Sequence, residues 1–407
     1  MINHRIANHW RCLLLLSVTA LWFPLASFAQ TYTSLATGIN GQGFTIPSLA
    51  LGNNGFAYQL GSILPGQTTA MSQLNVGIGN SDNIQLLGLG RQNGFAYLVG
   101  FFDTSGWHAE GMLPGQVTPF SQITAGVGWG QSGNFNISGG GAGNTYSNNF
   151  LQVIGLGAND GLAYLAAFQD NQGHWHPGGI LPYAQNIPFS ELSVVIGSAY
   201  QLQVIGRAVS NGQLYLTAFQ DTEGNWHAAG LLPGQSPAVS SITTSEGNGT
   251  KGTVQVFGLG ASDGYIYLPD WQDGDGNWFA AGILPGQSTP LIQMVASVAL
   301  QGNENSGWYD IVVVGGIGAS DHMLHLTDWQ DSSGTWHAYA SGSVPILQVP
   351  VTQVVATGGA FVGLGEDNHI YLLTILYTDG GQIGYDLTPN AGVARWLPAV
   401  LQILNGL

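Results

Sequence analysis

The chain has 407 residues, only 7% of them charged, and a formal net charge of −16. Its six Lys and Arg residues are too few to bind the phosphates of nucleic acid or of anionic lipids, so the composition excludes these partners. The 62 Gly and the 11% aromatic residues suit neutral polar partners such as sugars. They equally fit an acidic secreted β protein that stays soluble through its net charge, and composition does not separate these interpretations.

The first 29 residues predict a signal peptide, residues 1–29. Arg5 and Arg11 give a positive leader, residues 12–26 form an apolar run, and residues 27–29 have the small-x-small pattern of a cleavage site. The apolar run is shorter than the roughly 20 residues that a spanning helix needs. No later stretch predicts a membrane helix, so we expect export and no membrane insertion.

After cleavage the mature chain begins at Gln30, and residues 30–407 are predicted to form a single domain. We expect the protein to be secreted and extracellular, or retained in a bacterial periplasm. Cys12 is the only cysteine and leaves with the leader. The mature fold is therefore predicted to lack disulfides and to depend on its core for stability.

A segment of strand and turn residues recurs along most of the chain as a tandem repeat. Its best copy reads L-Q-V-I-G-L-G-A-N-D-G-L-A-Y-L at residues 151–165. Seven copies can be aligned at an average spacing of about 52 residues, which is the range of four-stranded propeller blades. One ring residue marks the register of each copy: Tyr58, Tyr97, Tyr164, Tyr215, Tyr267, His325 and Tyr371.

Each copy predicts four short strands in a fixed order. The first reads S-Q-I-T-A-G-V-G from Ser121, and the second is the L-Q-V-I-G run, which alternates little and is predicted to be buried on both faces. An Asn-Asp-Gly turn leads into the third strand, which carries Tyr164 and ends near Phe168. A D-x-x-G turn then leads into a fourth strand that opens with Trp175.

Such strands, without a helical period, predict an all-β fold: a seven-bladed β-propeller of four-stranded blades. The first and last copies deviate from the pattern, as terminal repeats often do. Residues 126–147 and 246–253 are rich in Gly, Asn and Ser. We expect these two segments to be surface insertions between the first and second strands of their blades.

The blade pattern resembles that of the seven-bladed β-propeller lectins of the Psathyrella type and their bacterial relatives, and more distantly that of tectonin-like repeats. The shared pattern is L-x-V-x-G, an N/D-G turn, an aromatic strand ending in F-Q or W-Q, and a Trp strand. It is matched here by residues 151–155, Asp160–Gly161, Phe168–Gln169 and Trp175, and the resemblance covers nearly all of the mature chain.

This resemblance implies sugar sites between neighbouring blades, each combining an aromatic platform with polar groups, for glycans with neutral or acetylated sugars. The lectins commonly carry Trp where this chain has the repeated Tyr. They also have more Arg and Glu along the second strand, where this chain reads Gly-Leu-Gly. These departures leave the particular sugar open, and the oligomeric state and the number of working sites are open as well.

The Trp-His pairs of the fourth strands are the candidate carbohydrate-binding residues. Neighbouring strand residues face opposite ways, so one member can line a pocket while the other packs in the sheet. An indole face stacks on a pyranose and an imidazole hydrogen-bonds a hydroxyl. Alternatively, the Trp residues simply fill the space between blades. The candidates are Trp107, His108, Trp175, His176, Trp226, His227, Trp278, Trp336 and His337.

A metal site is not predicted, and neither is a cofactor. Four of the histidines lie in four different blades, and the pairs His174/His176 and His322/His325 lack a third ligand nearby. The segment that begins at Asp273 opens like a calcium loop but lacks its later Gly and its bidentate Glu. We interpret it as a hairpin turn.

Catalysis is the second class of function to weigh, and we expect none. A propeller glycosidase needs two carboxylates at one site, and a sialidase needs an Arg cluster, whereas Arg91, Arg207 and Arg395 occupy different places in their repeats. A non-catalytic scaffold or adhesin that binds a protein partner is the third class. One acidic cleft on the axis would favour the enzyme, and recurring inter-blade pockets would favour the lectin.

Overall fold

The computed structural model describes residues 31–386, except for gaps at 40–44, 60–61, 80–82, 104, 129–132, 135–144, 147–149, 171, 183–186, 198–200, 222–223, 235–236, 248–253, 304–306, 332, 340–347, 358–359 and 377–381. The predicted signal peptide lies outside the described residues. Residues Tyr32–Leu407 belong to one compact unit. The described part of this unit is built from strands and turns, with no helix, and so contains no helix that is long and apolar enough to cross a membrane.

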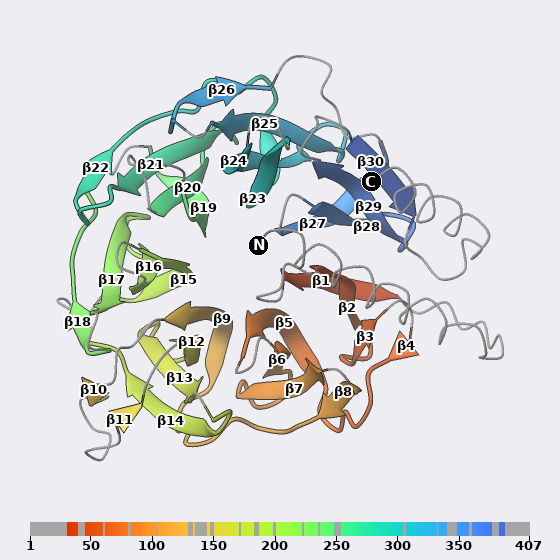
Figure 1. The fold of residues 1–407 in the computed structure, drawn as a ribbon, viewed down its shortest axis with the longest axis vertical. Coiled ribbons are helices and arrows are strands. Elements are labelled where there is room, and N and C mark those ends of the chain that lie inside the picture. Colours follow the sequence, from red (N-terminus) through yellow and green to blue (C-terminus); the bar gives the residue numbers. More distant parts are fainter. Residues whose placement is uncertain are drawn as a thin grey trace. The chain divides into compact units, whose positions relative to one another are not determined.

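Seven four-stranded antiparallel sheets form the blades of a β-propeller, which confirms the predicted fold class (Figure 1). Blade 1 contains β1–β4, blade 2 β5–β8, blade 3 β9 and β12–β14, blade 4 β15–β18, blade 5 β19–β22, blade 6 β23–β26 and blade 7 β27–β30. Each blade presents its first strand to the axis and its fourth strand to the rim (Figure 1).

The strand bounds follow the predicted repeat. The first strands are β1 (Tyr32–Ile39), β5 (Met71–Ile78), β9 (Phe120–Gly128), β15 (Phe189–Ile196), β19 (Val239–Ser245), β23 (Leu291–Asn303) and β27 (Val351–Thr357). The second strands are β2 (Thr45–Gly52), β6 (Ile84–Gly90), β12 (Phe150–Gly157), β16 (Leu202–Ala208), β20 (Val254–Gly260), β24 (Gly307–Gly318) and β28 (Ala360–Gly365).

The third strands are β3 (Ala57–Gln59), β7 (Ala96–Asp103), β13 (Ala163–Gln169), β17 (Leu214–Gln220), β21 (Ile266–Gln272), β25 (Leu324–Gln330) and β29 (Ile370–Leu376). The fourth strands are β4 (Ser62–Ile63), β8 (Gly106–Ala109), β14 (Trp175–Ile180), β18 (Trp226–Ala228), β22 (Trp278–Ala280), β26 (Trp336–Ala338) and β30 (Gln382–Asp386).

The predicted insertion at 126–147 begins later than expected. Strand β9 continues to Gly128, and the insertion contains a two-stranded hairpin of its own, formed by β10 (Gly133–Asn134) and β11 (Thr145–Tyr146). The end of β9 agrees with the first-strand pattern that begins at Ser121, whereas the hairpin was not predicted, because Gly-rich segments carry little strand propensity. The second insertion lies between β19 and β20, as predicted.

The second strands form the buried layer of each blade. Every residue of β6 and of β20 is buried, which confirms that this run faces a neighbouring blade on both sides. The turns that follow have the predicted geometry: Gly161 has φ +66°, and Gly173 of the D-x-x-G turn has φ +87°. A Cβ at Gly157 would lie 2.1 Å from Asp160 Oδ1, so any larger residue there would displace this carboxylate.

A glutamine on the first strand joins each of several blades to the next, and we call this contact the glutamine clamp. In blade 2, Gln73 Nε2 donates to the Ile123 carbonyl at 2.9 Å, and Gln73 Oε1 accepts from the Ile123 N–H at 3.0 Å. Gln122 and Gln293 form the same two bonds to Leu192 and Val354. The Gln of the S-Q-x segment therefore joins adjacent blades through hydrogen bonds.

The ring closes between its first and last blades. Gln353 of β27 accepts a hydrogen bond from the Leu35 N–H of β1 at 2.7 Å, which is one half of a glutamine clamp. Asn368 adds a second bond, because its Oδ1 accepts from the Tyr32 N–H at 2.7 Å. A buried apolar cluster that includes Leu35 and Leu372 packs across the same junction.

Candidate functional site

The Trp-His pairs lie on the fourth strands, and their two members face opposite sides of the blade. In blade 3, Trp175 pairs with Gln169 across the strands and packs against the apolar cluster that blade 3 shares with blade 2. His176 pairs instead with Phe168, which belongs to the cluster shared with Trp226 of blade 4. The predicted division of the pair between two faces is confirmed.

Each histidine is held by an aromatic ring and by the Asp of its D-x-x-G turn. His176 stacks on Phe168 at a centroid distance of 5.1 Å, and its Nε2 lies 2.7 Å from Asp170 Oδ2. The imidazoles remain partly exposed, from 27% for His176 to 47% for His227. The same arrangement joins His108 to Asp103, His227 to Asp221 and His337 to Asp331.

These turn carboxylates are held ionised. Hydrogen bonds from the Ser105 side chain and backbone, with a smaller contribution from His108, lower the pKa of Asp103 to about 2. Burial opposes ionisation of Asp170, but hydrogen bonds from His176 and from backbone N–H groups outweigh it and lower its pKa. An ionised carboxylate only accepts, so each facing imidazole presents its Nε2–H to the Asp and its other nitrogen elsewhere.

The tryptophans pack into the interfaces between blades. Trp226 is 7% exposed, whereas Trp107, Trp175, Trp278 and Trp336 are half-buried. All five belong to, or pack against, the apolar clusters that join adjacent blades. They therefore fill the inter-blade space, and whether they also serve as sugar platforms stays a prediction.

Buried glutamine pairs cross four of the same interfaces. In interface 2/3, Gln85 Nε2 of blade 2 donates to Gln169 Oε1 of blade 3 at 2.7 Å, and Gln169 Nε2 donates to the Gly173 carbonyl. The equivalent pairs are Gln152–Gln220, Gln203–Gln272 and Gln255–Gln330. Sequence reasoning missed these pairs, although both glutamines were visible as repeated letters in L-Q-V and F-Q.

Each of these four interfaces leaves one buried donor and one buried acceptor without a partner among the described residues. The donors are Nε1 of Trp175, Trp226, Trp278 and Trp336, and the acceptors are Oε1 of Gln85, Gln152, Gln203 and Gln255. An unpaired buried polar group costs about 1–3 kcal/mol, so eight such atoms at repeated positions require an explanation.

Interface 1/2 lacks this unmet pair. Trp107 Nε1 donates to Gln59 Oε1 of blade 1 at 2.8 Å, so its hydrogen-bonding capacity is met within the protein. The five tryptophans singled out in the sequence therefore divide into four equivalent members and one exception. The sequence did not distinguish Trp107, because its partner lies in the irregular first blade.

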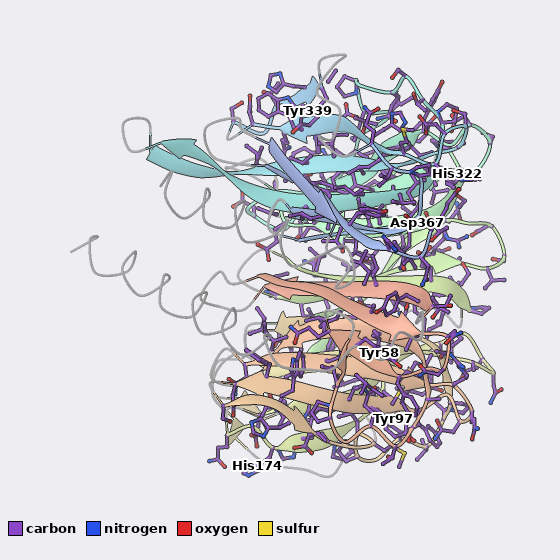
Figure 2. The ribbon with its side chains drawn as sticks, turned by 90° about the vertical axis from the view of Figure 1, so that its right-hand side faces the viewer. Tyr58, Tyr97, His174, His322, Tyr339 and Asp367 are labelled. Atoms are coloured by element: carbon purple, nitrogen blue, oxygen red, sulfur yellow. The ribbon has the colours of Figure 1, made fainter. Side chains whose placement is uncertain are left out.

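The described residues do not assemble a metal site. No group of three or more His, Cys, Asp or Glu that could hold an ion occurs among them. His322 contacts Glu366, whereas His325 contacts Asp321, and Figure 2 shows His322 and His174 at opposite sides of the molecule. The Asp273 segment is a hairpin turn, as predicted: Asp273 Oδ1 accepts the N–H groups of Asp275 and Asn277.

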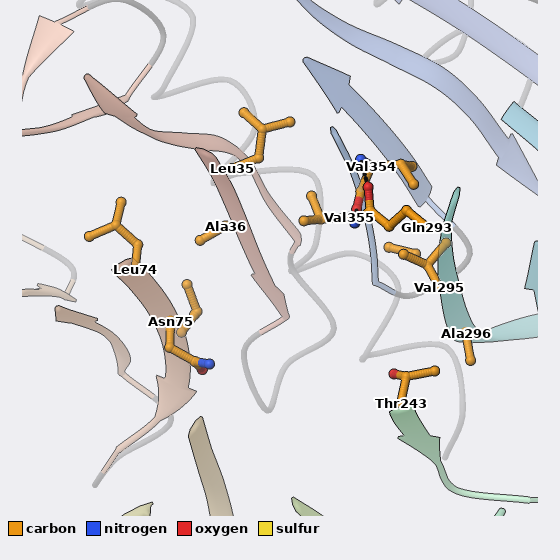
Figure 3. A pocket seen from close by; sticks show the side chains of 12 residues that line it. Leu35, Ala36, Leu74, Asn75, Thr243, Gln293, Val295, Ala296, Val354 and Val355 are labelled. Atoms are coloured by element: carbon orange, nitrogen blue, oxygen red, sulfur yellow. Dashed lines mark hydrogen bonds between the residues drawn. The ribbon is translucent and has the colours of Figure 1, made fainter. Parts of the chain in front are cut away.

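A cavity of about 300 Å³ lies on the axis, lined by first strands of blades 1, 2, 5, 6 and 7 (Figure 3). Its polar side chains are Asn75, Thr243 and Gln293, and the other lining residues are Leu, Val and Ala. The lining is therefore neutral, unlike the acidic cleft that the glycosidase alternative predicts.

No family model and no curated protein matches the chain. Among solved structures, the SapL1 lectin in complex with alpha methyl fucoside is similar at 13% identity, over 79% of this chain and 98% of that chain, with a TM-score of 0.45. The α-L-arabinanase of Penicillium chrysogenum complexed with arabinobiose is similar at 8% identity, over 87% and 99%, with a TM-score of 0.39.

A third similar structure is the CRINKLY WD40 ectodomain of the Arabidopsis thaliana receptor kinase ACR4, at 11% identity over 88% of this chain and 99% of that chain, with a TM-score of 0.38. The three differ in kind: one is a lectin, one an arabinanase and one a receptor ectodomain. At these identities and TM-scores the likenesses carry no argument about function.

Proposed function

We propose that the protein is a secreted, non-catalytic carbohydrate-binding propeller, similar in kind to the Psathyrella-type lectins, whose sites lie at interfaces 2/3, 3/4, 4/5 and 5/6. One observation carries the proposal: the same unmet pair, an indole N–H and a glutamine Oε1, recurs in all four interfaces. A sugar supplies hydroxyls, which donate and accept, and an acetamido group offers a carbonyl and an N–H.

The surroundings of the unmet pair also suit a neutral sugar. Trp175, Trp278 and Trp336 are half-buried and offer apolar edges at the rim. The partly exposed imidazoles of His108, His176 and His227 offer a ring nitrogen for a hydroxyl at interfaces 2/3, 3/4 and 4/5. Cations are scarce in the whole chain, which disfavours strongly anionic ligands. Each site alone is expected to be weak, and four sites on one ring raise avidity on a glycan-coated surface by roughly 10²–10⁴.

Replacing Trp226 by Phe tests the site with its fold intact. The change removes Nε1–H but keeps an apolar ring in the interface, so we expect one binding site of four to be lost in calorimetric sugar titrations. Trp107→Phe is the matched control, because Trp107 Nε1 is already bonded to Gln59. It should leave the number of sites unchanged, and loss of a site in this control instead would refute the assignment.

The sugar itself is to be found with a glycan array, run on the chain from Gln30 with and without calcium. Binding to one sugar class supports the lectin, and a calcium effect would contradict our interpretation of the Asp273 turn. A blank array from folded protein would favour the scaffold that binds a protein partner. Release of reducing ends from a bound glycan would favour the glycosidase.

A further inference from the structure

The glutamine clamp is a primary carboxamide that holds one backbone residue of the next blade at both its N–H and its C=O. In the clamps of Gln73, Gln122 and Gln293, all six donor–acceptor distances lie between 2.9 and 3.1 Å. These backbone groups face away from the neighbouring strand of their own sheet, because they belong to the edge strand at the axis.

Blade 1 lacks the clamp, since Ser34 stands where four other first strands carry Gln, namely Gln73, Gln122, Gln293 and Gln353. The residue that a Gln at position 34 would hold is Leu74, which pairs with Gly88 as Ile123 pairs with Gly155. In the described part of the chain, no side chain bonds to the Leu74 backbone. The Ser34 hydroxyl is itself buried without a hydrogen-bond partner there.

Leu74 lines the axial cavity, next to Asn75. The side chains of Asn75 and Thr243 project toward one another from opposite walls, whereas Gln293 forms its clamp to Val354 on a third (Figure 3). No hydrogen bond involves the Asn75 or the Thr243 side chain among the described residues. The remaining lining is aliphatic, and a volume of about 300 Å³ accommodates a small molecule.

We propose that the axial cavity binds a small neutral molecule that carries a primary carboxamide, which takes at Leu74 the place of the glutamine clamp that blade 1 lacks. The ligand's carbonyl accepts the Leu74 N–H, its amide N–H donates to the Leu74 carbonyl, and its apolar body lies against the Val and Ala side chains. This site is separate from the four rim interfaces and does not rest on the proposed function.

The geometry of the amide selects the ligand. A primary carboxamide has an N–H on the same side as its carbonyl, so it can bond both groups of one residue. The secondary amide of an acetamido sugar is trans, so its N–H and carbonyl point in opposite directions. Acetamido sugars are therefore predicted to bind at the rim and not on the axis.

Propanamide is the probe, with N-methylacetamide as the matched trans amide. Propanamide is expected to raise the Tm of the full chain saturably and to titrate to one site per chain, whereas N-methylacetamide gives neither response. Ser34→Gln supplies the missing clamp, so its Tm should exceed that of the unmodified protein and its propanamide response should be lost. Equal responses to the two amides would overturn the proposal.

Ser241→Gln is the control for stabilisation alone. Ser241 occupies the clamp position of blade 5, so the backbone of Met294 in blade 6 also lacks a clamp. Met294 does not line the cavity, so this variant should keep the propanamide response. If Ser34→Gln fails to fold, a crystal of the unmodified chain soaked with 3-bromopropanamide decides the matter. Bromine density beside Leu74 supports the site, and density elsewhere or none at all overturns it.

Discussion

Glu191 Oε2 lies 3.3 Å from Arg207 Nε, and this ion pair occupies two positions of blade 4 that three other blades fill with Gln and Leu. The equivalent pairs are Gln73–Leu89, Gln122–Leu156 and Gln353–Leu364. Glu191 still performs half of the clamp, because its Oε2 accepts the Ile242 N–H at 3.1 Å. Burial raises the pKa of Glu191, and Arg207 opposes that rise.

The pair should behave as a unit in a double-mutant cycle. Arg207→Leu leaves a largely buried carboxylate without its cation, and Glu191→Gln leaves the guanidinium without its anion. Each single change is expected to destabilise by about 1–3 kcal/mol. The double variant restores the Gln–Leu pattern and should unfold in urea close to the unmodified protein. Additive losses would contradict this coupling.

Asp270 should make stability depend on pH. It is fully buried, its Oδ1 accepts the Gly234 N–H at 2.6 Å, and burial raises its pKa to about 7. The folded chain therefore binds more protons than the unfolded chain between about pH 4 and pH 7. This contribution is fully present below about pH 4 and is lost as the pH rises through 7.

The measurement is the free energy of urea unfolding from pH 4.5 to pH 8, in the unmodified protein and in Asp270→Asn. The unmodified protein is expected to lose roughly 2–4 kcal/mol more across this range than the variant, because Asn does not ionise. Parallel pH profiles for the two proteins would show that Asp270 does not titrate in this window.

A side chain at Gly197 should destabilise the fold. A Cβ there would lie 2.1 Å from Gln203 Nε2 and 2.9 Å from Gln272 Oε1, so it would displace a buried glutamine pair. We expect Gly197→Ala to destabilise by roughly 1–3 kcal/mol through overpacking and a lost hydrogen bond. Gly282→Ala is the control, because a Cβ there meets nothing within 4 Å. Equal urea midpoints for both variants would count against the close approach.

His227 can be replaced by Phe with little loss of stability. Blade 5 already has Phe279 at this position, where it stacks on Trp271 at 4.6 Å as His227 stacks on Phe219 at 5.2 Å. The lost contact to Asp221 is largely exposed, so the expected change is within about 1 kcal/mol. A much larger drop in thermal stability would mean that the His-Asp contact, rather than stacking, holds the fourth strand.

Much of the fold could be predicted because the repeat encodes it locally. The φ-positive Gly161 and the capping Asp170 specify turns through their own backbone chemistry. The second strands alternate little between apolar and polar residues, which implies two covered faces. The hairpin β10–β11 escaped prediction because Gly and Asn carry little strand preference.

The candidate site was likewise predictable only in part. The sequence alone determined which residues recur, namely the Trp-His pairs and the two glutamines, and that the members of each pair face opposite ways, because strand periodicity is a local property. Only the tertiary structure decided that Trp226 packs into a neighbouring blade, that Gln59 satisfies Trp107, and that four interfaces share an unmet donor and acceptor. These outcomes depend on which side chains of adjacent blades meet, and such contacts join residues far apart in the chain that no local pattern specifies.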